Sequence, residues 1–232
     1  IDLNAGTGSG DMEQEKDDLC WLIDCALACT DKKLTLDAAD ISVIARGAEH
    51  LAGRRDWMLN SVNGDSEERL AKGLGLAGEH GVPVIALAMD EDGIPPEAQR
   101  RLEICEHMHQ VALSKGVKSG DLFFDPLVLP VSADTKQPKV TFEVLRGIHE
   151  RFPDAKTTMG LSNVSHGLSK RAKVNSGFLM IAIGMGLDSA ICDPSRPSVI
   201  QAILTADMLM GKDRYCRKFS RAARKGVFDT KK

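Results

Sequence analysis

Short apolar runs alternate with longer amphipathic stretches along the whole chain. Each run has the length of a β-strand and is almost continuously apolar, as is typical of strands buried on both faces of a parallel sheet. The predicted strands are residues 1–5, 34–38, 57–62, 83–89, 122–129, 157–162 and 189–192. The predicted helices are residues 11–29, 41–51, 66–80, 96–115, 140–152, 175–186 and 198–210.

Strand and helix alternate seven times, and repeated βα units form a parallel sheet. The chain opens with Ile1-Asp2-Leu3-Asn4, without a methionine and already with the pattern of a strand. Seven units preceded by a missing one would make eight, the number that closes a TIM-type barrel. The sequence therefore predicts an α/β protein: a single (β/α)8 barrel domain over residues 1–232, truncated at its N-terminus and lacking its first βα unit. A doubly wound open sheet is the alternative that the pattern leaves open.

Composition argues against several other classes of protein. Of the 232 residues, 43% are hydrophobic and 27% are charged, which is ordinary for a soluble globular domain. The net charge is −3 and aromatic residues make up 4%, so the chain lacks both the basic bias and the stacking side chains of nucleic-acid-binding proteins. No apolar run approaches the roughly 20 residues that span a bilayer. We therefore expect neither a nucleic acid nor a membrane as partner.

The cysteines indicate a reducing compartment. The chain has six of them, and none forms a CxxC pair or matches the spacing of a zinc site. Buried, reduced thiols are the simpler interpretation. We expect a cytoplasmic protein on this basis.

The polar residues that follow the apolar runs carry the functional signal. A carboxylate or carboxamide stands where a strand passes into its loop at Asn4, Asp37, Asn60, Asp125 and Asn163. In a barrel these positions converge at the C-terminal mouth, where active sites are built. One such residue is readily explained as a helix cap or turn former, but five at equivalent places indicate a binding site.

The residue types at these five positions suggest the ligand. They include no His, Cys or Lys, so they are a poor set for nucleophilic catalysis or metal binding but a good hydrogen-bonding set. A carboxylate accepts two parallel donors, and a carboxamide offers one donor group and one acceptor. A flat heterocycle with an amidine-like edge and a carbonyl, such as a pterin or a purine, fits this inventory. With no metal ligands evident, we expect the chemistry to reside in the substrate and in a cofactor carried by another protein.

The strand-end segments resemble those of the pterin-binding methyltransferases that transfer the methyl group of methyltetrahydrofolate to a corrinoid protein. The most specific segments are Asp125-Pro126-Leu127-Val128-Leu129-Pro130 and Gly160-Leu161-Ser162-Asn163-Val164-Ser165. Supporting segments are residues 2–6, 36–37 and 59–61, and the likeness extends through nearly the whole chain. The wider group also includes dihydropteroate synthase and the folate module of cobalamin-dependent methionine synthase.

The resemblance implies an activity and its participants. A methyl group would move between N5 of tetrahydrofolate and the cobalt of a protein-bound corrinoid (cobalamin), in either direction. Tetrahydrofolate or 5-methyltetrahydrofolate would be the substrate, and a corrinoid protein would be the partner. Members of this family are typically dimers, so a homodimer is expected.

The resemblance also implies roles for individual residues. Asn163 is expected to reach N5, where the methyl group is attached. The expected substrate-binding residues are Asp37, Asn60, Asp125, Ser162, Asn4 and Arg171. His166 stands where the closest relatives are expected to carry an amide side chain.

Two rival functions remain open at this point. A dihydropteroate synthase would need groups for a pyrophosphate leaving group and for p-aminobenzoate, and residues 164–171 lack the lysine and arginine loop motifs usual there. A folate-binding module without catalysis would share nearly all the binding residues. The presence of Asn163 argues against the second rival.

Overall fold

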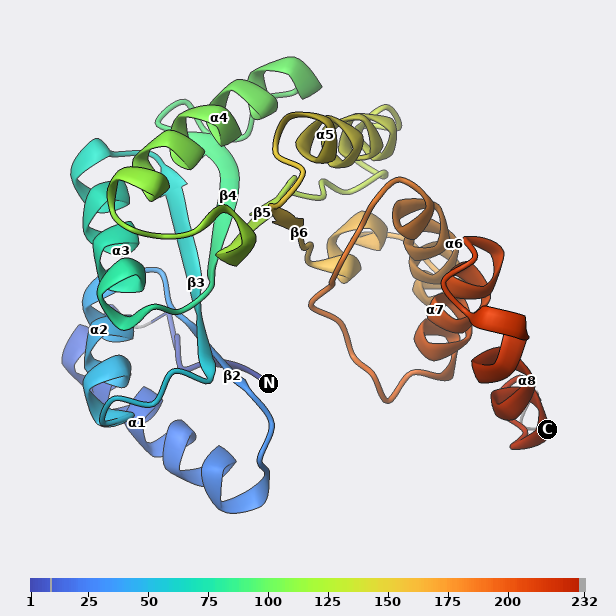
Figure 1. Ribbon diagram of the computed structural model, residues 1–232, viewed down its shortest axis with the longest axis horizontal. Helices are drawn as coiled ribbons and strands as arrows, with labels where there is room; N and C mark the ends of the chain where they lie inside the picture. Colours follow the sequence, from blue (N-terminus) through green and yellow to red (C-terminus); the bar gives the residue numbers. More distant parts are fainter. Residues whose placement is uncertain (9, 230–232) are drawn as a thin grey trace.

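The computed structural model describes residues 1–8 and 10–229, which form one parallel sheet with helices between successive strands (Figure 1). The strands are β1 (Asp2–Asn4), β2 (Leu34–Asp37), β3 (Trp57–Gly64), β4 (Val84–Asp90), β5 (Leu122–Asp125) and β6 (Lys156–Thr157). The helices are α1 (Met12–Cys29), α2 (Ile41–His50), α3 (Glu67–His80), α4 (Ala98–Ser114), α5 (Gln137–Arg151), α6 (Arg171–Gly184), α7 (Pro197–Leu209) and α8 (Arg217–Arg224). Short 3-10 turns are η1 (Ser119–Asp121), η2 (Leu161–Ser165) and η3 (Arg214–Cys216).

Local sequence signals set the ends of several helices. The side chains of Asp40 and Ser66 accept hydrogen bonds from the backbone N–H groups of Ser42 (2.7 Å) and Arg69 (3.4 Å). These caps satisfy N–H groups that have no partner within the first turn of a helix. Helix α3 ends at Gly81, whose φ of 63° is a left-handed conformation that glycine adopts without steric cost.

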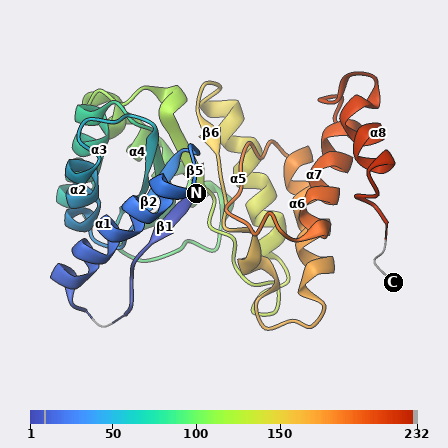
Figure 2. The same ribbon diagram turned by 90° about the horizontal axis from the view of Figure 1, so that it is seen from below.

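The strands follow the chain in the order β1-β2-β3-β4-β5-β6, and every neighbouring pair is parallel. An order without a switch point excludes the doubly wound alternative. Helices α1–α4 cover one side of β1–β4, and α5 lies between the sheet and the helices α6–α8 (Figures 1 and 2). The prediction of a parallel α/β fold of the barrel type is confirmed.

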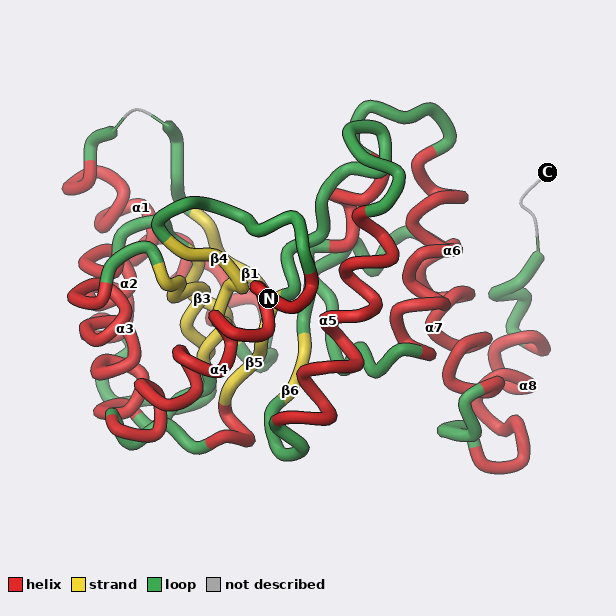
Figure 3. Tube along the Cα trace, turned by 90° about the horizontal axis from the view of Figure 1, so that it is seen from above, coloured by secondary structure: helices red, strands yellow, loops and turns green. Residues whose placement is uncertain are grey.

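The ring of strands is open in the described part of the chain. Strand β1 pairs with β2 and with no other described strand, and the N-terminus lies in the space between the two halves of the molecule (Figures 1 and 3). The predicted strand 157–162 is mostly irregular, because β6 has two residues and η2 begins at Leu161.

The predicted seventh strand, residues 189–192, is reduced to a single parallel bridge between Gly160 and Ile191. The backbone N–H of Ile191 donates to Met159 O (2.9 Å), and the backbone N–H of Ser189 donates to Thr157 O (3.1 Å). The segment therefore runs beside β6 as the pattern predicts. It lacks a longer ladder because the neighbouring chain turns into η2 after Gly160.

Two hydrophobic clusters hold the molecule together. The larger one joins β1–β5 to α1–α5 and includes the fully buried Leu36, Leu59 and Phe124. The smaller one joins η2, α6 and α7 around residues such as Leu161 and Leu179. Each fully buried Leu or Phe stabilises the fold by about 1.5–3 kcal/mol relative to exposure. No helix within residues 1–8 and 10–229 combines the length and apolar character needed to cross a bilayer.

Candidate functional site

Three of the expected binding residues form a row across neighbouring strands. Asn4 on β1 is in register with Asp37 on β2, and Asp37 is in register with Asn60 on β3. The Nδ2 of Asn4 donates to Oδ2 of Asp37 over 2.8 Å, while the backbone N–H of Gly6 donates to Oδ1 of Asn4 over 2.9 Å. The Asn4 carboxamide is therefore held on both of its polar atoms, and it orients the Asp37 carboxylate.

Asp2 extends this row, although it is not among the residues expected from the strand ends. It lies two positions before Asn4, so both side chains project from the same face of β1. The Nδ2 of Asn60, which is 8% exposed, donates to Oδ1 of Asp2 over 3.3 Å. Burial raises the pKa of Asp2, and the negative charge of Asp37 raises it further. The period-two spacing of Asp2 and Asn4 is the sequence signal that could have identified it.

Asp125 ends β5 in a buried position, 8% exposed. Its Oδ1 accepts a hydrogen bond from the backbone N–H of Leu127 over 2.7 Å. Burial raises its pKa to about 6, and this rise is limited by hydrogen bonds from the backbone N–H groups of Leu127 and Gly160 and by the charge of Arg101. The carboxylate is thus a desolvated acceptor with fixed backbone donors on it, as suits recognition of a ligand's N–H groups.

Asn163 lies in η2 and is exposed. A Cβ atom placed on Gly160 would lie 3.2 Å from Nδ2 of Asn163, so the absence of a side chain at Gly160 makes room for the carboxamide. Within the described ranges, the Asn163 carboxamide makes no hydrogen bond to the protein. Its NH2 group and oxygen are therefore free to meet a ligand.

Arg171, at the start of α6, holds η2 in place. Its Nη2 donates to the backbone oxygen of Ser162 over 2.7 Å, and its Nε donates to Oγ of Ser165 over 3.0 Å. The backbone oxygen of His166 accepts from Oγ of Ser132 over 2.7 Å, while the His166 side chain is exposed. Ser162 is exposed as well. The residues around Asn163 therefore form an exposed surface, which the hydrogen bonds of Arg171 and Ser132 hold in place.

The structure thus brings the expected residues together in two groups. The row on β1–β3 contains Asn4, Asp37 and Asn60, and the second group surrounds η2. Asp125 connects to the second group, because the backbone N–H of Gly160, three residues before Asn163, donates to its carboxylate.

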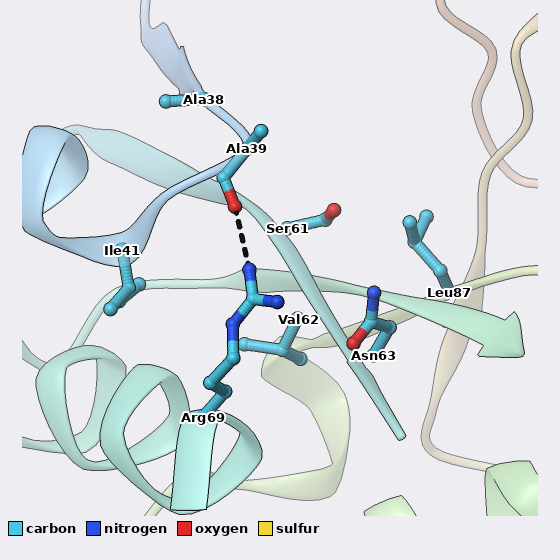
Figure 4. A pocket seen from close by; sticks show the side chains of 8 residues that line it. All are labelled: Ala38, Ala39, Ile41, Ser61, Val62, Asn63, Arg69 and Leu87. Carbon is cyan, nitrogen blue, oxygen red and sulfur yellow. Dashed lines mark hydrogen bonds between the residues drawn. The ribbon is translucent and has the colours of Figure 1, made fainter. Parts of the chain in front are cut away.

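A cavity of about 280 Å³ opens beside the row (Figure 4). Its lining residues are Ala38, Ala39, Ile41, Ser61, Val62, Asn63, Arg69 and Leu87. Two of these lining residues, Ala38 and Ser61, directly follow Asp37 and Asn60 in the chain. Arg69 reaches across it to donate to Ala39 O over 3.0 Å. Asn63, which the strand-end pattern did not single out, is in register with Leu87, and Leu87 is in register with Asp125.

The chain belongs to the pterin-binding enzymes: residues 1–193 match the sequence profile of this family. The chain is 30% identical over 227 residues to the methylcorrinoid:tetrahydrofolate methyltransferase of Eubacterium limosum, and the match covers 97% of this chain and 82% of that protein. It is 37% identical over 174 residues to the methionine synthase of Mycobacterium tuberculosis, covering 70% of this chain but 14% of the synthase. The expected resemblance to folate and corrinoid methyltransferases is confirmed.

Solved structures of dihydropteroate synthases share the fold. The enzyme from Yersinia pestis with a pterine-sulfa conjugate superimposes with a TM-score of 0.67 at 16% identity, over 91% of this chain and 82% of that one. The enzyme from Xanthomonas albilineans in complex with 7,8-dihydropteroate gives a TM-score of 0.66 at 16% identity, over 90% of this chain and 78% of that one. At this identity the likeness establishes the architecture alone.

Proposed function

We propose that this chain binds a folate and transfers a methyl group between N5 of tetrahydrofolate and the cobalt of a corrinoid carried by another protein. The observation that carries the proposal is the 30% identity, over 97% of this chain, to the methyltransferase of Eubacterium limosum. The polar groups at the strand ends have the chemistry that this reaction needs. Residues 1–232 would act as one domain, and we propose a homodimer as its working form.

Pterin recognition would fall to the buried acceptors. A carboxylate has about four lone-pair sites. The N–H groups of Leu127 and Gly160 use two of those on Asp125. The remaining two can accept the parallel N–H donors of the pterin's amidine edge. Asp37 and Asn60 would bind other polar atoms of the ring, with Asn4 orienting Asp37 through its 2.8 Å hydrogen bond.

Around N5, Ser162 and Arg171 would complete the substrate contacts, and Arg171 would also hold η2 through its bond to Ser162 O. The exposed His166 borders this surface. The openness of η2 suits the reaction, because a corrinoid protein must bring its cobalt in line with the N5–methyl bond.

Asn163 would act on the reacting nitrogen. A methylated amine is a poor methyl donor, since the nitrogen leaves with its electron pair. A reduced corrinoid would supply the electron pair of the new cobalt–carbon bond, so N5 would keep the pair of the broken carbon–nitrogen bond and would take a proton originating from solvent. The free NH2 of Asn163 would donate a hydrogen bond that strengthens as N5 becomes electron-rich, which is preorganised electrostatic stabilisation. The same contacts serve the reverse direction.

Single-turnover methyl transfer from methyltetrahydrofolate to reduced cobalamin tests the proposal. We expect folate demethylation and cobalt methylation in equal amounts within one turnover. Tight folate binding without transfer, to free or protein-bound corrinoid, would favour a binding module instead. Release of pyrophosphate from dihydropterin pyrophosphate and p-aminobenzoate would show that the function follows the dihydropteroate synthases, whose fold the chain shares.

A further inference from the structure

Helix α4 places an arginine, Arg101, in the protein core with 0% exposure. Its Nη1 donates to the backbone oxygens of Pro126 (2.7 Å) and Leu127 (2.9 Å). Its Nε donates to Pro95 O (2.7 Å), and its Nη2 donates to Oε1 of Gln137 (2.8 Å). The guanidinium therefore connects the segment before α4, the end of β5 and the start of α5.

All four hydrogen bonds of Arg101 go to uncharged acceptors, three carbonyl groups and one carboxamide. A buried charge is costly unless an opposite charge compensates it. Burial lowers the pKa of Arg101, and the carboxylate whose charge opposes this effect is Asp125. The core thus contains a positive and a negative group that act on each other without a direct hydrogen bond between them.

Arg101 and Asp125 both bind the backbone of the turn after β5. Arg101 binds the carbonyl oxygens of Pro126 and Leu127, and Asp125 accepts from the N–H of Leu127 over 2.7 Å. Leu127 has a φ of 61°, a left-handed conformation that a branched residue seldom adopts. Contacts on both its N–H and its C=O explain how this conformation is maintained.

We propose that Arg101 is a positioning residue of the folate site, which orients Asp125 through the turn after β5 and supplies a positive charge that favours the ionised form of this carboxylate. The inference rests on the proposed function, in which Asp125 accepts the pterin's N–H donors. In this proposal, a residue of α4, a helix outside the site, influences the protonation state of Asp125.

The groups around Asp125 support a role for this charge. On α4 the titratable neighbours are Arg101 and Cys105, and burial raises the pKa of the Cys105 thiol, which is therefore neutral at physiological pH. Directly before η2, the backbone N–H of Gly160 contacts Asp125, and from α5 the uncharged Gln137 accepts a hydrogen bond from Arg101. The charge of Arg101 lowers the pKa of Asp125, so loss of this charge would raise that pKa further above about 6.

The test is the pH dependence of methyltetrahydrofolate affinity, measured by calorimetry from pH 5 to pH 9. In the wild type, affinity should fall as the pH decreases through about 6, because protonated Asp125 loses acceptor capacity. In Arg101→Met the midpoint of this pH dependence should rise, because the positive charge that lowers the pKa of Asp125 is lost. Arg101→Lys keeps the charge and loses the forked hydrogen bonds, so its affinity should fall at all pH values with the midpoint unchanged.

A second variant keeps the arginine itself. Gln137→Glu places a carboxylate at the position 2.8 Å from Nη2, where it pairs with Arg101 and neutralises its charge. The midpoint of the pH dependence of affinity should again rise. This variant provides the test if Arg101→Met fails to fold. Leu102→Ala, on the same helix and 7% exposed, is the matched control for destabilisation alone and should leave the midpoint in place.

Unshifted midpoints in Gln137→Glu and in folded Arg101→Met, with normal folate binding by the wild type, would overturn the inference about Arg101 alone. Failure of the wild type to bind methyltetrahydrofolate at any pH would overturn the proposed function together with it.

Discussion

The two halves of the molecule differ in the burial of particular polar residues. In the half built on β1–β5, Asn60 and Asp125 are each 8% exposed and lie against the larger hydrophobic cluster. In the half built on η2, α6 and α7, Asn163 and Arg171 are exposed and the supporting cluster is smaller. Desolvated acceptors favour tight and selective binding of a ring, whereas an exposed donor leaves space for a second macromolecule. Under the proposed function, the buried acceptors of the first half would bind the pterin ring and the exposed Asn163 of the second half would act at N5.

The largest effect should come from the exposed half. Asn163→Ala removes the donor that we propose acts on N5, and loss of one preorganised donor costs about 10²–10³ in rate. We expect single-turnover methyl transfer to slow by that order, while folate affinity falls much less, because the hydrogen bond strengthens in the transition state. Stopped-flow absorbance of the cobalamin measures the rate, and calorimetry measures the affinity.

Asn163→Asp is the matched contrast, because an ionised carboxylate cannot donate to N5 and transfer should also be impaired at neutral pH. A full rate in Asn163→Ala would refute the catalytic role and favour a non-catalytic or different-substrate function.

A substitution in the buried half should change the affinity for the folate. Asp125→Ala removes the charged acceptor that we propose for the pterin's amidine edge, and such a hydrogen bond contributes about 1.5–3 kcal/mol, or roughly ten- to a hundredfold in the dissociation constant. Isothermal calorimetry with methyltetrahydrofolate checks this. Unchanged affinity would mean that the pterin ring does not contact Asp125.

The burial of Asp125 should also affect how the stability of the fold depends on pH. Its folded pKa of about 6 exceeds the ordinary 3.8, so the folded state binds more protons between these values and stability falls as the pH rises from 4 to 6. Two pKa units correspond to about 3 kcal/mol at most. Asp125→Asn should therefore reduce the loss of melting temperature over this range while it weakens folate binding. A wild-type melting temperature that rises steadily from pH 4 to 7, and does so equally in the variant, would contradict this assignment.

The smallest effect is expected at the contact between the two halves. Gly160→Ala introduces a methyl group 3.2 Å from Nδ2 of Asn163, which displaces the carboxamide by a few tenths of an ångström. We expect about a tenfold loss of transfer rate with little change in affinity, since small misplacements of reacting groups reduce rates. Gly75→Ala, whose new methyl group meets no atom within 4 Å, is the control. Equal rates in both variants would show that the position of Asn163 tolerates this shift.

The strand-end residues show how far sequence reasoning extends into the site. Asn4, Asp37 and Asn60 each follow an apolar run, and parallel strands of similar length bring such positions into register, as observed. Arg101 gave no comparable signal, because arginine on an amphipathic helix is ordinarily exposed. Its burial depends on four acceptors, which come from the segment before α4, the turn after β5 and the start of α5.

The sequence by itself determined the alternation of strands and helices, the parallel sheet and the polar set at the strand ends, because hydrophobic period and turn chemistry are local properties. The tertiary structure decided that residues 189–192 pair through one bridge, that Asp2 joins the row through Asn60, and that Asp125 titrates near 6. These features depend on distances between remote segments and on exclusion of water, and local pattern encodes neither.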